Sequence, residues 1–311
     1  MRDAFINELV QLAEEDPTVF LVIGDLGFGV VEEFAERFPD RFLNAGVAEQ
    51  TMIGVASGLA ASGYKVFCYS IANFPTARCL EQIRNDVCYH GRNVTIVSVG
   101  SGLAYGILGY THHAVEDMSF LRALPGMRVM SPSDPEEARA LTRYVVEQPG
   151  PAYLRIGKNG EPNMHEKPLV VDSTDTLYRL RSGADVAILS TGSILPEAVA
   201  AADALSERGI DTQVISVPFV KPLPSSLARE VSGVKLVVTV EEHTVVGGFG
   251  SAVLEQFARD GVRTPVELIG LGEEKSGIGN QNYLRASAGI DAASIADRVE
   301  GALSRRLSAT A

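Results

Sequence analysis

Short runs rich in apolar residues alternate along the chain with segments of helical periodicity. Two of these runs are Val19–Ile23 and Val94–Val99, which are rich in β-branched residues. Runs this short and this apolar are typical of strands that are buried on both faces of a parallel sheet. The helical segments between them supply the crossovers that parallel strands need. The alternation therefore predicts an α/β fold of mainly parallel sheets flanked by helices.

The strand–helix pattern occurs twice, with a break between the two sets. Residues 157–182 contain two glycines and two prolines among scattered charges, which is typical of a linker. A length of 311 residues fits two domains of about 100–200 residues each. We predict a first domain over residues 1–165, a linker over 166–180 and a second domain over 181–311. Strands are expected at 65–69, 128–130 and 152–156, then at 186–189, 213–217, 236–240 and 266–269.

The composition excludes several classes of function. The formal net charge of −12 would repel a phosphate backbone, and no basic run overrides it. No apolar run reaches the length of about 18 residues that a membrane-spanning helix needs. The N-terminal residues lack the layout of a signal peptide. Cys68, Cys79 and Cys88 have no metal-ligand spacing, so we expect reduced thiols, a cytoplasmic protein and no metal site in this chain.

One carboxylate, Glu49, lies in a run of small residues over positions 44–63. The spacing of the small residues predicts a helix that packs closely against another part of the structure. An ionisable group at such a place needs a partner or a task. Alternatively, Glu49 is an acid in the first helical turn, where the helix dipole favours negative charge. The stretch by itself leaves both interpretations open.

Four other places carry possible chemistry, each with an ordinary alternative. Asp25 follows a strand in a glycine turn, but aspartate is also a common turn former. Tyr69 and Phe74 could clamp a flat ring, but aromatic residues also fill cores. His112 follows a glycine-rich loop, 100–109, and long loops are often functional. The segment 241–250 resembles a dinucleotide-binding glycine loop only in part, so close packing of a helix start is preferred there.

Several motifs in order make the chain similar to the C-terminal half of a transketolase, and also to that of deoxyxylulose-phosphate synthase. The first is Gly46-Val-Ala-Glu49-Gln50, which resembles the family stretch with the glutamate that activates thiamine diphosphate. The others are Ala114-Val-Glu-Asp117, Leu124-Pro125, Ser131-Pro-Ser-Asp134 and the segment 238–252. The resemblance spans nearly the whole chain.

The resemblance implies a pyrimidine-binding domain followed by a transketolase C-terminal domain. The diphosphate-binding domain, with its Gly-Asp-Gly…Asn signature for Mg²⁺ and the cofactor phosphates, has no counterpart in this sequence. The resemblance thus implies one subunit of a split transketolase, in which a separate subunit holds Mg²⁺ and the diphosphate. Since closed two-fold symmetry is common, an α2β2 heterotetramer is expected. The implied reaction is the transfer of a two-carbon ketol unit between sugars or sugar phosphates.

The resemblance also implies roles for residues at the cofactor. Glu49 matches the carboxylate that shares a proton with N1′ of the aminopyrimidine, so that the cofactor's own imino group can act as base. Tyr69 and Phe74 match the aromatic region that stacks on this ring. Arg78 and Asp25 match residues that lie near the cofactor.

For the substrate, His112 matches a histidine that contacts the donor hydroxyl or the developing oxyanion. Arg2 and Arg155 fall where relatives use arginines on a sugar phosphate. Two positions depart from the family pattern, because Leu108 replaces a substrate-contacting aspartate and Gly100 falls where relatives have a histidine. These departures predict a donor or acceptor other than the usual pentose phosphates.

Three alternatives share parts of this pattern. A β subunit of a 2-oxoacid dehydrogenase has the same pair of domains, and a carboligase like deoxyxylulose-phosphate synthase uses the same cofactor. A non-catalytic assembly subunit would only complete the fold of a partner. The matches at Glu49, Tyr69 and His112 favour an enzyme, and those at His112 and Arg155 favour ketol transfer.

Overall fold

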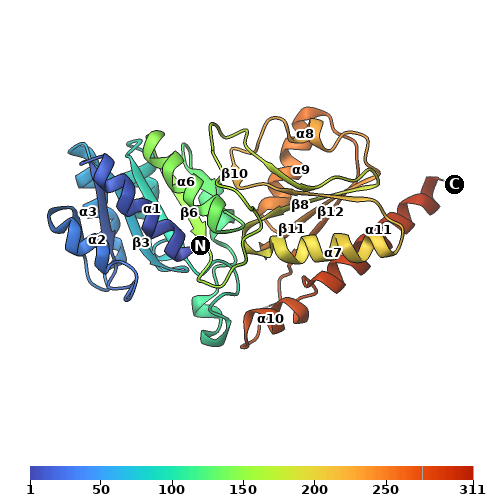
Figure 1. Cartoon of the computed structure of the whole chain (residues 1–311), viewed down its shortest axis with the longest axis horizontal. Coiled ribbons are helices and arrows are strands. Elements are labelled where there is room, and N and C mark those ends of the chain that lie inside the picture. Colours follow the sequence, from blue (N-terminus) through green and yellow to red (C-terminus); the bar gives the residue numbers. More distant parts are fainter. Residues whose placement is uncertain (275, 311) are drawn as a thin grey trace.

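The computed structural model describes residues 1–274 and 276–310, with side chains up to residue 305. Two sheets flanked by helices lie side by side along the long axis of the molecule (Figure 1). One sheet has seven strands and the other has five. Most neighbouring strands in both sheets are parallel. The predicted fold class, two mainly parallel α/β domains, is confirmed.

The first sheet has the strand order β10-β5-β6-β4-β3-β1-β2, and only the pair β10–β5 is antiparallel. Its central strands are buried along their whole length, as their apolar sequences predict. The bounds of its strands are β1 (Val19–Ile23), β2 (Phe42–Asn44), β3 (Lys65–Ile71), β4 (Val94–Val99), β5 (Arg128–Met130), β6 (Ala152–Ile156) and β10 (Phe219–Lys221).

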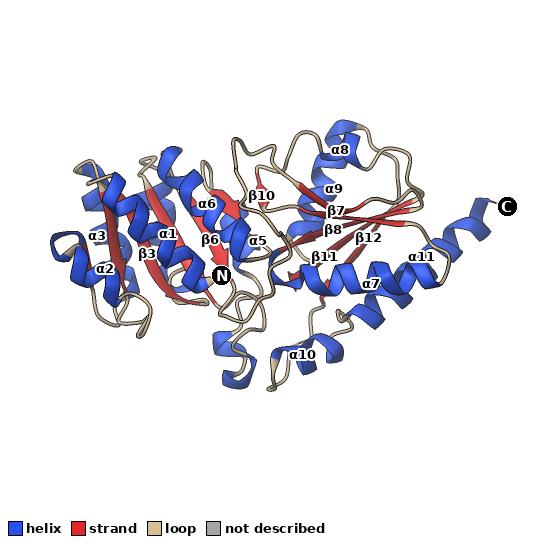
Figure 2. Ribbon diagram, in the orientation of Figure 1, coloured by secondary structure: helices blue, strands red, loops and turns tan. Residues whose placement is uncertain are grey.

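Helices cover both faces of the first sheet (Figure 2). Side chains of α1 and α6 form one core with Phe67 and Tyr69 of β3, and side chains of α3 form another with Val66 and Cys68. The alternation along β3 thus feeds both cores. The helices of this region are α1 (Arg2–Glu15), α2 (Glu32–Arg37), η1 (Pro39–Arg41), α3 (Glu49–Ala61), η2 (Ala77–Cys79), α4 (Leu80–Gln82), η3 (Ile83–Cys88), η4 (Gly106–Leu108), η5 (Tyr110–His112), α5 (Asp117–Arg122) and α6 (Pro135–Glu147).

The second sheet has the order β12-β11-β8-β9-β7, with β7 antiparallel at one edge. Its strands are β7 (Tyr178–Arg181), β8 (Val186–Thr191), β9 (Thr212–Ser216), β11 (Leu236–Thr244) and β12 (Val266–Leu271). The helices around it are η6 (Gly192–Ile194), α7 (Leu195–Glu207), α8 (Leu227–Glu230), α9 (Phe249–Asp260), α10 (Gln281–Ser287) and α11 (Ala292–Thr310).

The segment 74–90 is not one regular helix but contains three different helical turns. It begins with the 3-10 turn η2, continues through the short helix α4 and ends in the π-helical turn η3. The ring of Pro75 disfavours a helical backbone conformation for the residue before it, so a regular helix is not expected to include Phe74. At the other end, Tyr89 N donates to the carbonyl of Arg84, five residues earlier. The irregular start places Arg78 at the beginning of the segment, next to α3.

Strand β10 crosses between the two halves of the chain. It follows β9 of the second sheet by two residues, yet it pairs with β5 of the first sheet. Strand β7 belongs to the second sheet although most of it lies in the predicted linker. The boundaries 1–165 and 181–311 stay predictions, and a cut at 181 would remove this edge strand.

A buried polar cluster joins the segment just before the predicted linker to the start of α6. Asp134 caps the helix by accepting a hydrogen bond from Glu137 N at 2.8 Å, and Glu137 Oε2 accepts one from Ser133 N at 2.7 Å. This reciprocal pair resembles a capping box, with Asp134 at the N-cap and Glu137 as the reciprocal acceptor. His165, just before the predicted linker, contacts Asp134 Oδ2 through Nδ1 at 3.0 Å. Burial raises the pKa of Glu137 to about 7.

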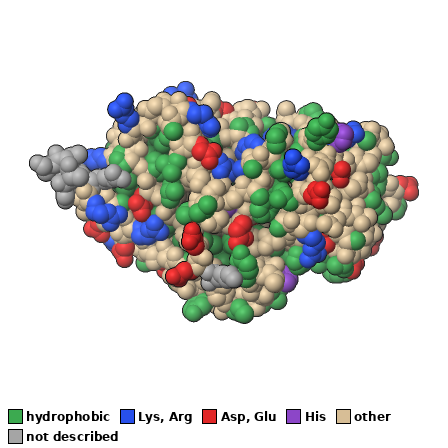
Figure 3. Space-filling view, turned by 180° about the vertical axis from the view of Figure 1, so that it is seen from behind, with side chains coloured by type: hydrophobic (Ala, Val, Ile, Leu, Met, Phe, Trp, Pro, Cys, Tyr) green, Lys and Arg blue, Asp and Glu red, His purple; other side chains and the backbone are tan. Residues whose placement is uncertain are grey.

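The surface charges and the helix lengths can be compared with the expectations of no nucleic-acid binding and no membrane span. On the face drawn in Figure 3, acidic and basic side chains are interspersed. Among the helices of the described residues, none combines the length and apolar character needed to cross a bilayer. The three cysteines are free, and two of them are buried.

Candidate active site

The candidate site lies at the carboxyl edge of the first sheet, where β1, β3 and β4 end. In open α/β sheets this edge is where ligands bind, because the loops that leave the strands converge there. The segments that leave these strands contain Asp25, Phe74 and the loop before His112. Glu49 reaches the same edge from the start of α3.

Glu49 is a buried carboxylate with only one of its two oxygens paired. Its side chain is 1% exposed, and Oε2 accepts a hydrogen bond from Arg78 Nη1 at 2.7 Å. Oε1 is buried and has no hydrogen-bond partner. Gly24, at the end of β1, borders this oxygen, since a Cβ built on Gly24 would lie 3.7 Å from it. The same Cβ would lie 3.5 Å from Ser70 Oγ, a second buried oxygen without a partner.

Phe74, Arg78 and His112 line the open side of this carboxylate. The Arg78 guanidinium lies 4.4 Å from the centre of the Phe74 ring, within the range of a cation–π contact. The His112 ring meets Phe74 edge-on, with centroids 5.2 Å apart. Arg78 is 46% exposed, and Phe74 and His112 are half-buried. A flat polar ligand at this surface would find an aromatic face, a cation and an unpaired carboxylate oxygen together.

Asp25 has a left-handed backbone conformation, with φ of 57°. Its Oδ1 accepts a hydrogen bond from Asn44 Nδ2 at 2.9 Å, and its own N–H donates to Asn44 Oδ1. Asn44 Oδ1 also accepts from Gly46 N at 2.9 Å. Asn44 therefore joins the β1 turn to the loop that leads to Glu49. This strained turn is held at the edge of the site, where the sequence predicts Asp25.

Tyr69 does not reach this surface, so the stacking role predicted for it does not fit the structure. Its side chain is 1% exposed and stacks on Phe5 of α1, with ring centroids 6.1 Å apart. Neighbouring residues of a strand point to opposite faces of the sheet. Ser70, the next residue, is therefore the one that faces Glu49, and no pattern in the sequence pointed to it.

Arg155 is also enclosed, so the predicted contact with a sugar phosphate does not fit. It is 1% exposed, and its Nε donates to Asp117 Oδ2 at 2.8 Å. Its Nη2 donates to the carbonyls of Ala114 and Glu242. The guanidinium thus joins three segments in the interior, where its position within strand β6 places it.

Two other cations lie close to the site edge. Arg2 lies near Tyr105. Burial raises the pKa of the Tyr105 hydroxyl, and the positive charge of Arg2 partly opposes this rise. Lys158, just beyond the end of β6, holds its Nζ 4.8 Å from the centre of the Tyr105 ring. Lys158 is a cation that sequence reasoning missed; its place directly after a parallel strand was the available signal. Tyr105 also fills the space beside Gly100, where a Cβ would overlap its ring.

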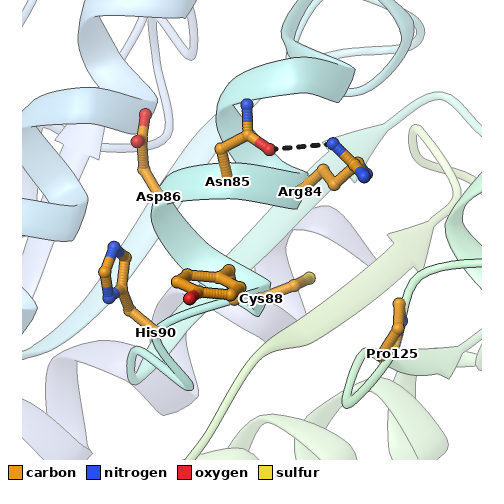
Figure 4. Close-up of a pocket in the computed structure, with 7 residues that line it drawn as sticks. Arg84, Asn85, Asp86, Cys88, His90 and Pro125 are labelled. Atoms are coloured by element: carbon orange, nitrogen blue, oxygen red, sulfur yellow. Dashed lines mark hydrogen bonds between the residues drawn. The ribbon is translucent and has the colours of Figure 1, made fainter.

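A hollow of about 640 Å³ lies elsewhere, among Arg84, Cys88, His90 and Pro125 (Figure 4). Three of these residues precede β4, whereas the Glu49 edge is where β4 ends. The hollow is therefore at the opposite edge of the sheet. The Glu49 surface is shallower because it is open on one side, and we assign the chemistry to it on its carboxylate, cation and aromatic groups.

The first sheet, with a buried, half-paired carboxylate at its carboxyl edge, is followed in the chain by a second α/β region, and comparison with known families assigns both. Residues 1–161 match the family "Transketolase, pyrimidine binding domain", and residues 175–295 match "Transketolase, C-terminal domain". The chain belongs to the transketolase family, and this confirms the resemblance noted in the sequence.

Relatives of similar length are separate subunits. The chain is 35% identical to one of the subunits of the apulose-4-phosphate transketolase of Phocaeicola vulgatus, over 93% of each chain. It is 39% identical to 1-deoxy-D-xylulose-5-phosphate synthase of Thermomicrobium roseum, over 96% of this chain but 48% of that protein. A solved structure described as a split-gene transketolase, inactive beta4 tetramer, superposes with a TM-score of 0.90 at 34% identity over 97% of this chain and 98% of that one. The chain is thus a transketolase-type transferase, and these relatives of similar length are named as a subunit and as a split-gene protein.

The family depends on thiamine diphosphate, and the residues present fit the pyrimidine half of this cofactor. The test is the buried Oε1 of Glu49, which lies beside Gly24 and Ser70 and has no hydrogen-bond partner among the described residues. A protonated ring nitrogen would satisfy it. A buried acceptor without a partner is otherwise costly, so its presence favours a ligand donor.

Proposed function

We propose that this chain is the C-terminal subunit of a split, thiamine-diphosphate-dependent transketolase, which transfers a two-carbon ketol unit between sugars or sugar phosphates. The observation that carries the proposal is the half-paired Glu49 at the carboxyl edge of the first sheet. A separate subunit would supply the diphosphate-binding domain and Mg²⁺. The free cysteines support a cytoplasmic location.

The residues of this chain have distinct tasks in the proposed mechanism. When bound, thiamine diphosphate would supply the carbanion chemistry that ketol transfer needs. Glu49 Oε1 holds the proton at N1′ of the pyrimidine, while Arg78 fixes the other carboxylate oxygen. Phe74 presents a ring for stacking, and the burial of Glu49 keeps water from competing for its oxygen. His112, beside Phe74, is placed to contact the donor hydroxyl or the oxyanion.

The partner would cover the surface that surrounds Glu49. Phe28 and Val47 are both 76% exposed and flank the Asp25 turn and the start of α3. Gly54 and Gly58 on α3 have no atoms near the place where a Cβ would be, so a second chain can approach this helix closely. Apolar residues next to a half-built site support an assembly in which another subunit completes it. Two copies of each subunit, α2β2, would satisfy two-fold symmetry.

The substrate side supports an anionic sugar that differs from the usual pentose phosphates. Arg2 and Lys158 are cations beside Tyr105 that suit a phosphate or similar group. Leu108, in place of an aspartate of the family pattern, is 52% exposed and offers no hydrogen bond to a hydroxyl. Tyr105 occupies the space next to Gly100. Fewer hydroxyl contacts favour a less hydroxylated or otherwise unusual substrate.

Reconstitution tests this function. The chain is mixed with a partner that carries the Gly-Asp-Gly…Asn signature, thiamine diphosphate and Mg²⁺, and ketol transfer is measured over a panel of phosphorylated and non-phosphorylated ketoses. We expect transfer only when both subunits are present, and none with the Glu49→Ala chain. Ordinary efficiency with xylulose and ribose phosphates would contradict the substrate proposal. Lipoyl-linked decarboxylation of a 2-oxoacid would instead identify a dehydrogenase β subunit. Activity of the complex that persists with the Glu49→Ala chain would indicate an assembly role.

A further inference from the structure

We propose that Glu242, a residue of the second domain, is a positioning residue for the His112 loop, residues 100–113 of the first domain. The proposal rests on the function proposed above, because it concerns how that site is held together. It also gives a role to the Glu-Glu-His segment of β11, which the cofactor chemistry leaves unused. Four sets of contacts support it.

The Glu242 carboxylate crosses from one domain to the other. It lies on β11 and is 2% exposed, and its Oε1 accepts a hydrogen bond from Leu103 N of the loop at 2.6 Å. The same oxygen accepts from Gln281 Nε2 of α10 at 2.8 Å, and Oε2 accepts from Arg285 Nε at 2.5 Å. A single carboxylate therefore joins the His112 loop and α10, and both its oxygens are paired.

The base of the loop closes against the same carboxylate. Gly102 and Ala114 exchange two backbone hydrogen bonds, of 2.9 and 3.0 Å, which bring the ends of the loop together. Gly102 has φ of 63°, and a Cβ there would lie 2.5 Å from Glu242 Oε1. Leu103 is fully buried and packs with the core of the second domain. His112 is two residues from this closure, so a shift of the base moves its ring.

The tip of the loop is seated on the segment before and within α10. Gly279 N donates to the carbonyl of Gly106 at 3.3 Å. A Cβ on Gly106 would overlap Leu284 and the Gly279 carbonyl. Figure 1 shows the two segments, one teal and one orange-red, projecting from the same side of the molecule at the junction of the domains. The loop therefore has two attachments to the second domain. At the base, Glu242 accepts a hydrogen bond from Leu103; at the tip, the loop contacts α10, which Glu242 also binds.

Arg285 extends the attachment into the second domain. Its Nη2 donates to the Ser193 carbonyl at 3.1 Å, and its Nη1 lies 3.5 Å from Glu197 Oε1 at the start of α7. The chain of contacts runs from α7 through Arg285 and Glu242 to Leu103. The second domain thereby sets the distance between His112 and the Phe74–Glu49 surface.

Hydrogen exchange of the unliganded chain tests the contact without any assumption about activity. We expect peptides from residues 102–113 to exchange about tenfold or more faster in Glu242→Ala, and less so in Glu242→Gln, which keeps one acceptor for Leu103 N. Gly106→Ala, which unseats the tip without touching the buried carboxylate, should also speed their exchange. Should Glu242→Ala not fold, Glu242→Gln and Gly106→Ala decide the result. Wild-type protection of the loop in both folded variants would overturn the proposal.

A matched control removes a different carboxylate of the same domain. Glu267 of β12 pairs with Arg298 at 3.1 Å and touches no part of the loop. Glu267→Ala should leave the exchange of residues 102–113 unchanged. Faster exchange of the loop in this control as well would show a general loosening of the domain, and would also overturn the proposal.

Kinetics of the reconstituted complex separate positioning from a general structural role. We expect Glu242→Ala to lower kcat by about tenfold to a hundredfold through displaced His112, with cofactor affinity unchanged because Glu49 and Phe74 stay in place. Glu242→Gln should restore part of kcat. A parallel loss of cofactor affinity, without rescue by Gln, would overturn the positioning role. A wild-type complex without transfer activity would defeat the proposed function alone, since the exchange result stands separately.

Discussion

Two buried glutamates, Glu242 and Glu49, each pair with an arginine, but they differ in how many of their oxygens are paired and in how buried the arginine is. Glu242 has both oxygens paired, and its arginine, Arg285, is itself buried. Glu49 has one oxygen paired to a half-exposed Arg78 and one oxygen with no partner. A saturated carboxylate of this kind fixes structure, whereas an unsaturated one keeps its capacity for a ligand. The two carboxylates are equally buried, so the number of partners separates the structural glutamate from the one proposed to be catalytic.

The largest expected effect is on catalysis at the unsaturated carboxylate. Glu49→Gln in the assembled enzyme should lower the transfer rate by about 10²–10⁴-fold, because an amide cannot hold the N1′ proton as a carboxylate does. The free energy of unfolding of the isolated chain should stay the same or rise, since a buried charge with one unpaired oxygen is removed. Steady-state rates and denaturant melts measure both. Unchanged C2 proton exchange of the cofactor in this variant would contradict the role of Glu49.

The second prediction concerns stability at the saturated carboxylate. Glu242→Ala should lower the free energy of unfolding by about 3–5 kcal/mol, because it leaves Arg285 as a buried charge without its main partner. Replacing both members, with Glu242→Gln and Arg285→Gln, should recover part of this loss. Denaturant melts of the two variants make the comparison. A loss below that of Glu267→Ala would show that the pair is not a structural one.

A third prediction concerns the pH dependence of the buried polar cluster formed by Asp134, Glu137 and His165. Burial raises the pKa of Glu137 to about 7 from an ordinary value of 4.5. Burial opposes the charge of His165, but its hydrogen bond to Asp134 raises the pKa of this imidazole. Both groups bind protons more tightly in the folded chain, so their contribution is full at low pH and is lost as the pH rises through the folded pKa values.

Unfolding free energy measured from pH 5 to pH 8 should therefore fall with rising pH by roughly 1–3 kcal/mol from these two groups. Glu137→Gln should flatten this slope, because its amide does not titrate. The matched variant Glu136→Gln, on the partly exposed side of the same helix turn, should change the slope less, because Glu136 acts only through its charge on His165. A slope that is identical in Glu137→Gln and wild type would exclude Glu137 as its source.

The smallest effect is expected at the exposed half of the open pair. Arg78→Gln should change the unfolding free energy by only about 0–1 kcal/mol, since its guanidinium is half-exposed. Cofactor affinity should fall more clearly, because Glu49 loses the group that orients it. Calorimetry with thiamine diphosphate and the reconstituted complex measures this difference. Equal losses in stability and affinity would place Arg78 with the structural pairs.

The sequence predicted the succession of strands and the location of the site better than the orientation of side chains. Strands β1 and β4 have the predicted bounds, because wholly buried strands leave an unbroken apolar signal. Tyr69 and Arg155 lie at the predicted places along the chain but face the interior. A position near a strand end does not tell which face a side chain takes, since a single residue separates the two faces.

The contacts between the two halves were beyond sequence reasoning for another reason. Leu103 N and Glu242 Oε1 are 139 residues apart in the chain, and nothing in either segment signals the other. The same holds for the free oxygen of Glu49, which is defined by what surrounds it. Saturation of a polar group is a property of the packed structure.

The crossing of β10 has a consequence for a nicked chain. A protease cut in the segment between β6 and β7 would divide the polypeptide, but the second piece would still contribute β10 to the sheet of the first. Ser131 N donates to the Pro218 carbonyl at 2.8 Å, and Gly192 N donates to the Ser131 carbonyl at 3.1 Å. Further backbone hydrogen bonds therefore join the two pieces beside the β5–β10 pair. The two fragments would remain one particle, and pulling them apart would require tearing a strand out of a sheet.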